Sequence, residues 1–365
     1  MSAEYTHGGR IFAVAAGLGI DPESIIDFSA SINPLGPAPG VAGALAAAFG
    51  RIVHYPEIGS PRLVQALADY HALSPERIAV ANGSTELIHL LPRIPDNRRQ
   101  RALILAPAFS EYAHSLELAG WQCDYLVMAD STGFDLDYER IATALQSGYD
   151  LLFCGNPGNP TGRLYRRAET ERLYRLCHDQ GCRFILDEAF IDFTEEESLK
   201  DGLPEEPDWL ILRSMTKFFG FPGLRLGYAI AAGELAARIR RHLPPWNIGV
   251  LAEAAGLAGL ADVDHIRRTR EVVAAERTRL AAGLAGIPGL VVFPGAANYL
   301  LLRTNAGQVV PQLVSELLRQ GLLIRNCADF FGLDASYFRI AIRRPEENDR
   351  LLAALTTVHR QLLTS

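Results

Sequence analysis

Short apolar segments alternate with amphipathic helical segments through the middle of the chain, and this alternation most constrains the fold. The predicted strands cover residues 78–81, 102–105, 151–154, 184–186 and 209–212. The predicted helices cover residues 42–49, 61–71, 87–91, 110–119 and 168–180. Such an order predicts a mainly parallel sheet with helices on both faces, and ligands of such sheets bind beyond the carboxyl ends of the strands.

The last third of the chain has a different pattern and indicates a second, smaller α+β domain. Its strand candidates cover residues 290–293, 299–302, 322–324 and 338–342, and its longest helices cover residues 263–284 and 346–363. The N-terminal segment is rich in turn-forming residues, so we expect an arm with short extended pieces that joins this second domain. We therefore predict a large domain at residues 36–242 and a small domain formed by residues 1–35 together with residues 243–365.

Composition and charge exclude several classes of protein. Of the 365 residues, 48% are hydrophobic and 21% charged, so the chain can bury a large core. A net charge of −7 without a Lys/Arg-rich block argues against a nucleic-acid partner. No secretory signal is visible, and no apolar run approaches the ~18 residues that cross a membrane. The five cysteines form no CxxC pair, which predicts reduced thiols, a cytoplasmic location and no metal site.

Lys217 is the candidate nucleophile of the chain. It follows the predicted strand 209–212 and is one of only two lysines in the sequence. The other, Lys200, lies in an acidic segment that is typical of a solvated loop. Phe218 and Phe219 beside Lys217 would lower the pKa of its amine by desolvation, as a lysine that forms imines requires. The alternative is a solvated surface lysine, the usual environment of this residue type.

Two further groups of residues indicate a phosphate subsite. Arg225 follows the lysine by eight residues, beyond a turn that contains Gly and Pro, and its planar guanidinium can bind a phosphate. Gly83, Ser84 and Thr85 lie at a predicted helix start, where free backbone N–H groups and the helix dipole attract an anion. Ser84 could instead be a helix cap, whereas Ser214 would add a further hydroxyl to the phosphate subsite.

Asp187, Asn159 and Phe109 indicate a ligand with an aromatic ring that contains nitrogen. Asp187 ends a predicted buried strand, where a lone carboxylate is costly unless it is paired. A pyridinium nitrogen is one such partner, and a structural ion pair is the alternative. Asn159 lies in a segment dense in Gly, Pro and Asn and could donate to a phenolic oxygen of the same ring. Phe109 could stack on the ring, with core packing as the alternative.

Together these motifs resemble the fold-type I, pyridoxal-phosphate-dependent aminotransferase family, and they follow the family order from Asn33 to Glu347. The resemblance implies an α/β fold, with helices flanking a mainly parallel sheet in the large domain, and pyridoxal 5′-phosphate as cofactor. It implies that Lys217 binds the cofactor aldehyde as an imine and that Asp187 pairs with the pyridine nitrogen. The other implied cofactor contacts are Asn159 at the ring oxygen, Phe109 on the ring face, and Gly83, Ser84, Thr85, Ser214 and Arg225 at the phosphate.

The same resemblance implies a homodimer and a set of substrate residues. Tyr55 resembles the family tyrosine that reaches the cofactor phosphate of the neighbouring subunit. Arg339 matches the arginine that usually binds the substrate α-carboxylate. The residues expected to bind a small phosphorylated amino acid are His7, Gly8, Asn33, Asn159, Arg325 and Arg339. The sequence leaves open which arginine binds a substrate phosphate and which binds a carboxylate.

Departures from other transaminases indicate a subfamily. Phe190 stands where many transaminases have a tyrosine whose hydroxyl reaches the ring oxygen, and Arg343 stands where histidinol-phosphate aminotransferases have glycine. With the start at His7-Gly8-Gly9, this pattern resembles the L-threonine-O-3-phosphate decarboxylases of cobalamin biosynthesis. The implied reaction releases CO₂ from L-threonine O-3-phosphate and forms (R)-1-amino-2-propanol O-2-phosphate.

Two other functions are compatible with the sequence. A histidinol-phosphate-like aminotransferase would share nearly every cofactor residue with the decarboxylase. The bond at the substrate Cα that is held perpendicular to the cofactor ring decides between them, because only that bond's electrons enter the π system. A perpendicular carboxylate bond gives decarboxylation, and a perpendicular C–H bond gives transamination. The remote alternative is a regulatory or binding protein that keeps the fold without turnover.

Overall fold

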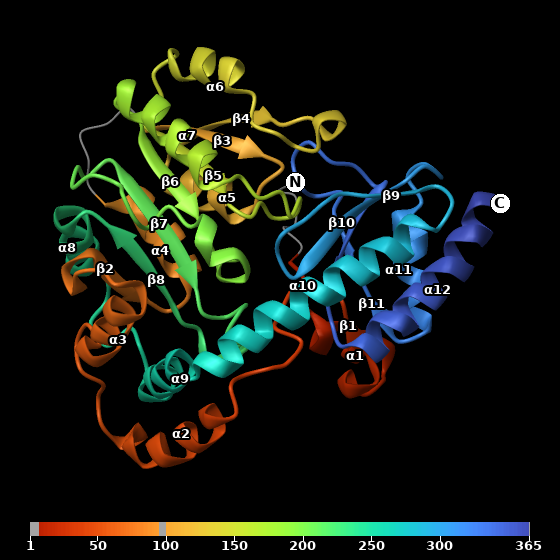
Figure 1. Cartoon of the computed structure of the whole chain (residues 1–365), viewed down its shortest axis with the longest axis horizontal. Helices are drawn as coiled ribbons and strands as arrows, with labels where there is room; N and C mark the ends of the chain where they lie inside the picture. The colour runs from red at the N-terminus through yellow and green to blue at the C-terminus, as the bar shows by residue number, and fades with distance from the viewer. Residues whose placement is uncertain (1–6, 95–99, 365) are drawn as a thin grey trace.

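The computed structural model describes residues 7–94 and 100–364, and its largest sheet has seven strands (Figure 1). These strands are β2 (Ile78–Ala81), β3 (Arg101–Ala106), β4 (Gln122–Val127), β5 (Leu151–Gly155), β6 (Arg183–Asp187), β7 (Trp209–Ser214) and β8 (Gly227–Ala231). Their order is β2-β8-β7-β6-β5-β3-β4, and β8 runs antiparallel to both of its neighbours. The other pairs are parallel, so the prediction of a mainly parallel sheet is confirmed.

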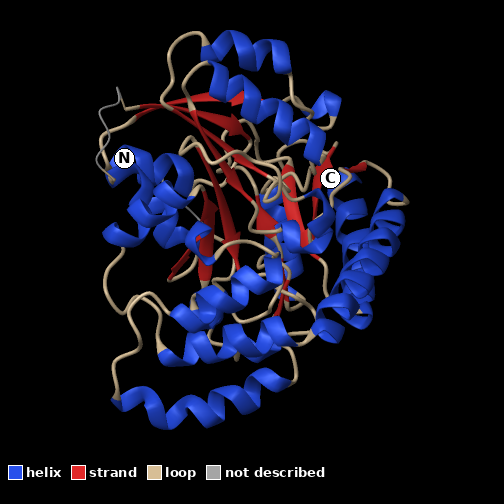
Figure 2. Ribbon diagram, turned by 60° about the vertical axis from the view of Figure 1, so that its left-hand side comes forward, coloured by secondary structure: helices blue, strands red, loops and turns tan. Residues whose placement is uncertain are grey.

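Both faces of this sheet are buried along its central strands, which explains why β5, β6 and β7 are largely apolar without alternation. In β7, Leu210 and Leu212 belong to one core, and Trp209 and Ile211 belong to the other. The helices of the first face are α4 (Ser84–Leu90), α5 (Glu111–Leu118) and α8 (Gly233–His242). The second face is covered by α3 (Pro61–His71), α6 (Tyr138–Leu145), α7 (Arg167–Asp179) and α9 (Val250–Ala261). Figure 2 shows helices on both sides of the strands.

A second group of strands lies beside the C-terminal helices (Figure 1). An antiparallel sheet of order β12-β13-β10-β9 consists of β9 (Leu290–Val292), β10 (Tyr299–Thr304), β12 (Arg325–Asn326) and β13 (Tyr337–Ala341). In the N-terminal segment, β1 (Ile26–Asp27) pairs in parallel with β11 (Leu322–Leu323). The helices beside these strands are α11 (Val310–Arg319) and α12 (Pro345–Thr364).

The long helix α10 (Val263–Ala285) connects the two groups of strands. Its first half contributes Ile266 and Val273 to a core of the large sheet, and its second half contributes Leu280 and Leu284 to the core of the small sheet. These positions recur with helical spacing and lie on the buried face of α10, which also includes Thr269 and Glu276. An α+β unit therefore follows the large sheet as expected, while the boundaries at residues 36 and 242 stay a prediction.

The N-terminal segment differs from the expectation at one point. We expected short extended pieces, whereas Ile11–Leu18 form helix α1. Three alanines in this stretch favour a helix, and Gly19 ends it in the left-handed conformation with φ of 67°. The next helix, α2 (Gly40–Ala48), packs on α9. Within residues 7–94 and 100–364, no helix combines the length and the apolar character needed to cross a bilayer.

Candidate active site

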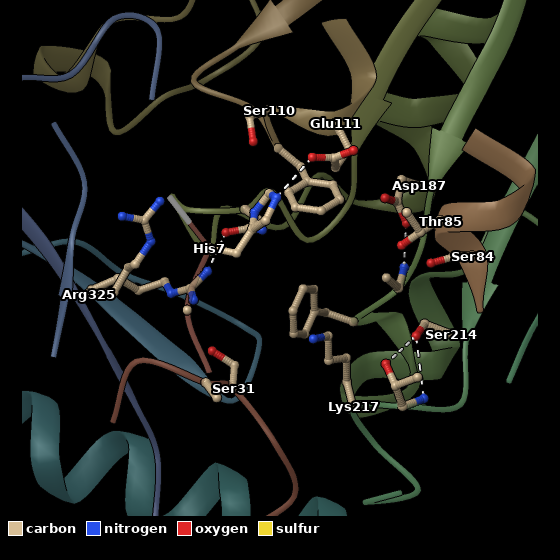
Figure 3. A pocket seen from close by; sticks show the side chains of 18 of the residues that line it. His7, Ser31, Ser84, Thr85, Ser110, Glu111, Asp187, Ser214, Lys217 and Arg325 are labelled. Atoms are coloured by element: carbon tan, nitrogen blue, oxygen red, sulfur yellow. Dashed lines mark hydrogen bonds and ion pairs between the residues drawn. The ribbon is translucent and has the colours of Figure 1, made fainter. Parts of the chain in front are cut away.

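A cavity of about 390 Å³ lies at the carboxyl ends of β5, β6 and β7. The predicted site residues that line it are His7, Gly8, Ser84, Thr85, Phe109, Asn159, Asp187, Ser214, Lys217, Arg225, Arg325 and Arg339. Figure 3 shows Ser84 and Ser214 on one side of Lys217, and His7 and Arg325 on the other side. The structure thus brings most of the predicted residues together in one place.

Lys217 projects into this cavity three residues after the end of β7. Its Nζ lies 6.0 Å from the centre of the Phe190 ring. Burial lowers the pKa of the Lys217 amine to about 8, and the positive charges of Arg339 and Arg225 act in the same direction. Near neutral pH such an amine is partly uncharged, which is the form that attacks an aldehyde.

Asp187 is the last residue of β6, and its carboxylate is buried. Its Oδ2 accepts a hydrogen bond of 2.6 Å from the Tyr112 hydroxyl, and its Oδ1 accepts one of 2.9 Å from the Ala189 backbone N–H. Burial raises the pKa of Asp187, whereas these two hydrogen bonds and the charge of Lys217 lower it. Because a carboxylate oxygen has two lone pairs, the Asp187 carboxylate can also accept a hydrogen bond from a protonated ring nitrogen.

The lining of the cavity includes the hydroxyl and guanidinium groups of Ser84, Thr85, Ser214, Thr216 and Arg225. Figure 3 shows Ser84, Thr85 and Ser214 across the cavity from His7. The Ser214 and Thr216 hydroxyl oxygens lie 2.7 Å apart. Gly83 precedes this group and has a φ of 79°, and a Cβ at this position would lie 2.5 Å from Nη2 of Arg225. A glycine is therefore needed for Arg225 to lie against the start of α4.

Two arginines of the small sheet also line the cavity. Arg339 of β13 donates to Oδ1 of Asn159 and, over 2.9 Å, to the backbone oxygen of Ser29. Arg325 of β12 forms an ion pair of 2.7 Å with Asp329. The two arginines are direct partners in the register of β12 and β13. Burial lowers the pKa of Arg339, but a guanidinium stays charged in proteins, so the pair can bind two anionic groups of one small molecule.

His7 and Gly8 bring the start of the described chain to the same cavity. Nε2 of His7 lies 2.9 Å from Oε1 of Glu111, and the centre of its ring lies 5.8 Å from that of Phe109. A Cβ at position 8 would lie 2.2 Å from the backbone oxygen of Ser29. Only glycine fits there, which explains how the N-terminal segment approaches the site so closely.

Asn33 and Tyr55 do not line this cavity. The Asn33 amide donates to the Phe218 backbone oxygen at 2.7 Å and to the Thr269 hydroxyl at 3.0 Å. Both amide hydrogens of Asn33 are thus used within the protein and anchor the loop that contains Lys217, while its contact with a substrate stays a prediction. Tyr55 is 81% exposed and packs on Trp246 with 4.7 Å between ring centres. Its reach into a neighbouring subunit stays a prediction.

The cavity also contains residues to which the sequence analysis assigns no role, among them Ser29, Ser31, Ser110, Glu111, Tyr112, Thr216 and Phe330. Tyr112 lies three residues after Phe109, which is close to one helical turn. That spacing is a signal that could have indicated Tyr112 as a second residue of the site. Glu111 belongs to no motif in this chain, so the sequence alone gives no reason to select it.

The family model described as aminotransferase class I and II matches residues 23–355 of the chain. The chain belongs to this family. A family member from Salmonella typhimurium, named threonine-phosphate decarboxylase, is 40% identical over 354 residues, which are 96% of each protein. The histidinol-phosphate aminotransferase of Roseiflexus castenholzii is 37% identical over 364 residues, which are 97% of this chain and 95% of that protein.

Two solved structures are similar to this aminotransferase class I and II chain over most of its length. The histidinol-phosphate aminotransferase of Clostridium acetobutylicum has a TM-score of 0.85 and 30% identity, and covers 92% of this chain and 99% of its own. The L-threonine-O-3-phosphate decarboxylase of Porphyromonas gingivalis has a TM-score of 0.80 and 27% identity, and covers 91% of this chain and 99% of its own. These similarities confirm the fold class, and they include both reactions that the sequence leaves open.

Proposed function

We propose that this chain is a pyridoxal-phosphate-dependent decarboxylase of L-threonine O-3-phosphate. The product is (R)-1-amino-2-propanol O-2-phosphate, for cobalamin biosynthesis. The observation that carries the proposal is the 40% identity, over 96% of both proteins, to the threonine-phosphate decarboxylase of S. typhimurium. The adenosylcobalamin biosynthesis bifunctional protein of Leptospira interrogans supports the same pathway, with 30% identity over 96% of this chain and 41% of that protein.

The cavity residues fit pyridoxal phosphate. The buried carboxylate of Asp187 keeps acceptor capacity beyond its two hydrogen bonds, as a ring nitrogen with a proton requires. The space beside Gly83, which a Cβ would fill, lets Arg225 meet the hydroxyl groups that suit a phosphate. When bound, the cofactor supplies a ring that accepts the electron pair of a bond at the substrate Cα.

We assign a different part of the cofactor to each of four cavity residues. The Lys217 amine would hold the cofactor through its aldehyde carbon, and the Asp187 carboxylate would accept a hydrogen bond from the protonated ring nitrogen. Arg339 donates to Oδ1 of Asn159, so the asparagine's amide nitrogen is directed elsewhere and can donate to the ring oxygen. Phe109 lines the same cavity and can cover one face of the ring.

The two arginines suit the two anionic groups of threonine phosphate. Arg339 donates to Oδ1 of Asn159, the residue proposed at the ring oxygen, so its guanidinium lies beside the proposed cofactor position. We assign the α-carboxylate to Arg339 for this reason, because the carboxylate is bonded directly to Cα. Arg325 and His7 then remain for the phosphate, with Gly8 beside them. By binding the carboxylate, Arg339 would orient the substrate so that the bond from Cα to the carboxylate, and not the Cα–H bond, is the one that breaks.

A histidinol-phosphate-like aminotransferase is the second candidate, since the R. castenholzii relative is 37% identical. Incubation with L-threonine O-3-phosphate and no keto acid separates the two reactions. Continuous CO₂ release supports the decarboxylase, whereas a single half-turnover that stops without CO₂ supports transamination. If neither CO₂ release nor a change in the visible spectrum were observed, the result would favour a protein without turnover. The same assay with serine phosphate and histidinol phosphate tests the choice of substrate.

We also propose that the active form is a cytoplasmic homodimer in which Tyr55 completes the neighbouring site. The exposed position of Tyr55 supports this, because the side chain does not line the cavity of its own chain and is accessible to a neighbouring subunit. Mixing Tyr55→Phe chains with Lys217→Ala chains provides the test. Hybrid dimers regain one intact site only if the tyrosine acts across the interface. Two inactive variants that stay inactive after mixing would contradict this arrangement.

A further inference from the structure

Glu111 joins two histidines beside the cavity, and the function proposed above gives it no task. Its Oε1 lies 2.9 Å from Nε2 of His7, and its Oε2 lies 2.8 Å from Nε2 of His89. A carboxylate offers only acceptors, so each Nε2 carries the hydrogen that it donates. Glu111 is buried and begins α5, whereas His89 lies on α4. Three separate segments therefore meet in one hydrogen-bonded chain, of which Figure 3 shows the His7 end.

The orientation of the His7 ring depends on this chain. The side chain is 46% exposed, and its ring also contacts Phe109 at 5.8 Å between centres. The backbone is fixed separately, because the Gly9 N–H donates to the Ser29 hydroxyl at 3.0 Å. A half-exposed ring that loses its charged partner Glu111 regains rotamer freedom even when its backbone stays in place. Glu111 thus fixes the orientation of the His7 ring and does not determine the backbone conformation of the N-terminal segment.

The pairing also explains how a carboxylate can line a cavity that receives an anion. An isolated Glu111 would repel a phosphate, but each of its oxygens accepts a hydrogen from an imidazole. A doubly protonated His7 ring has two N–H groups, so it can donate one to Glu111 and the other to a phosphate oxygen at the same time. Arg325 lines the same cavity and supplies a second positive group.

We propose that Glu111 is a positioning residue that directs His7 toward the phosphate group of the substrate, and that His89 holds Glu111 in the required orientation. The ligand class is a phosphate monoester of a small amine or amino acid. The inference rests on the proposed function only in placing a phosphate beside His7, and it does not depend on which bond at Cα breaks.

Binding of inorganic phosphate to the holoenzyme, measured by calorimetric titration, tests this proposal without turnover. In the holoenzyme the cofactor occupies its own phosphate subsite, so the titration reports the substrate subsite. Glu111→Gln keeps the size of the side chain and removes its charge, and we expect the Kd for phosphate to rise about tenfold. The matched control is Glu117→Gln, which removes the same charge from an exposed position of α5 and should change this Kd by less than about twofold.

A double-mutant comparison separates positioning from a general structural effect. In a His7→Ala background, Glu111→Gln should cause no further loss of phosphate affinity, because its effect passes through the His7 ring. His89→Ala leaves both other partners in place and should raise the Kd about threefold. This second variant also decides the matter if Glu111→Gln does not retain the cofactor.

Three results would overturn the inference. The first is that Glu111→Gln binds phosphate as tightly as the wild type, and the second is that His89→Ala does so. The third is that Glu111→Gln lowers the phosphate affinity by the same factor in the His7→Ala background as in the wild type. A steady-state comparison adds a readout that a loss of folding would not give. With L-threonine O-3-phosphate, Glu111→Gln should raise KM and leave kcat nearly unchanged. If the wild type releases no CO₂, the proposed decarboxylation fails, while the calorimetric result still stands on its own.

Discussion

Tyr112 donates a hydrogen bond of 2.6 Å to the buried carboxylate of Asp187. The tyrosine ring stacks on Phe153, with 4.7 Å between centres and an interplanar angle of 7°, so its hydroxyl has little freedom. Burial raises the pKa of Asp187, and the Tyr112 hydrogen bond lowers it. The tyrosine therefore helps to keep the carboxylate ionised at the place where we propose that the cofactor nitrogen binds.

Tyr112→Phe should lower kcat about tenfold, because a hydrogen bond to a charged group contributes roughly 1.5–3 kcal/mol. The pKa of Asp187 should move further upward, which favours the neutral acid and weakens its pairing with a ring nitrogen. Spectrophotometric titration of the apoprotein with pyridoxal phosphate measures the accompanying loss of affinity. The control is Tyr165→Phe, which removes a hydrogen bond of 2.9 Å to the Phe134 backbone oxygen outside the cavity. Equal losses of cofactor affinity in both variants would contradict the assigned role.

The pH dependence of cofactor capture should depend on Arg339. The positive charge of this residue helps to lower the pKa of Lys217 to about 8, so its removal should raise that pKa. The amine reacts in its neutral form, and Arg339→Gln should therefore shift the rate profile of cofactor uptake to higher pH. The measurement is the rise of visible absorbance after mixing apoprotein with pyridoxal phosphate. Lys217→Ala should give no such band, and an unchanged or downward shift in Arg339→Gln would refute the electrostatic argument.

A buried charge cluster adjoins the site residues Asp187 and Ser214 in the chain. Arg213 lies between three carboxylates, at 3.0 Å from Glu188, at 2.9 Å from Asp192 and in contact with Glu195. Arg213→Met should lower the free energy of unfolding by about 3–5 kcal/mol, because it leaves buried carboxylates without their cation. Urea denaturation measures this loss, and Arg213→Lys, which keeps the charge, should lose less.

The loss of unfolding free energy caused by Arg213→Met should become smaller as the pH falls. Burial raises the pKa of Glu188 and of Asp192, and the arginine opposes that rise in the wild type. Without the arginine, the folded-state pKa of both carboxyls moves further above the unfolded value, so folding takes up protons and stability is lost as pH rises. Denaturation curves at about pH 5 and about pH 8 test the sign. A deficit that grows toward acid would disprove this explanation.

Gly83→Ala should weaken cofactor binding about tenfold, because the new Cβ would displace the Arg225 guanidinium and occupy a strained backbone conformation. The control is Gly223→Ala in the same arginine loop, where a Cβ meets no atom within 4 Å. Affinity for pyridoxal phosphate, measured by absorbance, should stay near wild type in the control. The close approach of Gly83 to Arg225 would be irrelevant to function if both variants bound the cofactor equally well.

The spacing of hydrophobic residues was sufficient to predict elements whose burial follows directly from their own sequence. The predicted helix 61–71 and strand 78–81 coincide with α3 and β2. By contrast, the sequence pattern does not indicate β4 or β8 as strands. β4 is the edge strand of the sheet and has a polar first half, whereas β8 is rich in Ala and Gly. These residues have low strand propensity, and β8 is buried only because it inserts between β2 and β7.

The same distinction applies to the site. Lys217 and Asp187 could be predicted because each lies at or just after the end of an apolar strand, in a local pattern that carries chemistry. Tyr112, Glu111 and His89 could not be selected, because they meet their partners only when α4 and α5 pack on one face of the sheet. Asn33 is selected by its motif as a substrate residue, whereas its side-chain amide anchors the loop of Lys217 from outside the cavity. Its contact with a substrate stays a prediction.

Arg339 donates a hydrogen bond to Ser29, a residue 310 positions earlier, and both line the cavity with Lys217. Translation proceeds from the N-terminus, so the lysine leaves the ribosome well before the arginine does. A growing polypeptide that already carries every proposed cofactor residue still lacks Arg325 and Arg339. The proposed substrate pocket is therefore complete only after residue 339 has been added, so we expect cofactor binding, but not turnover, to be possible before that point.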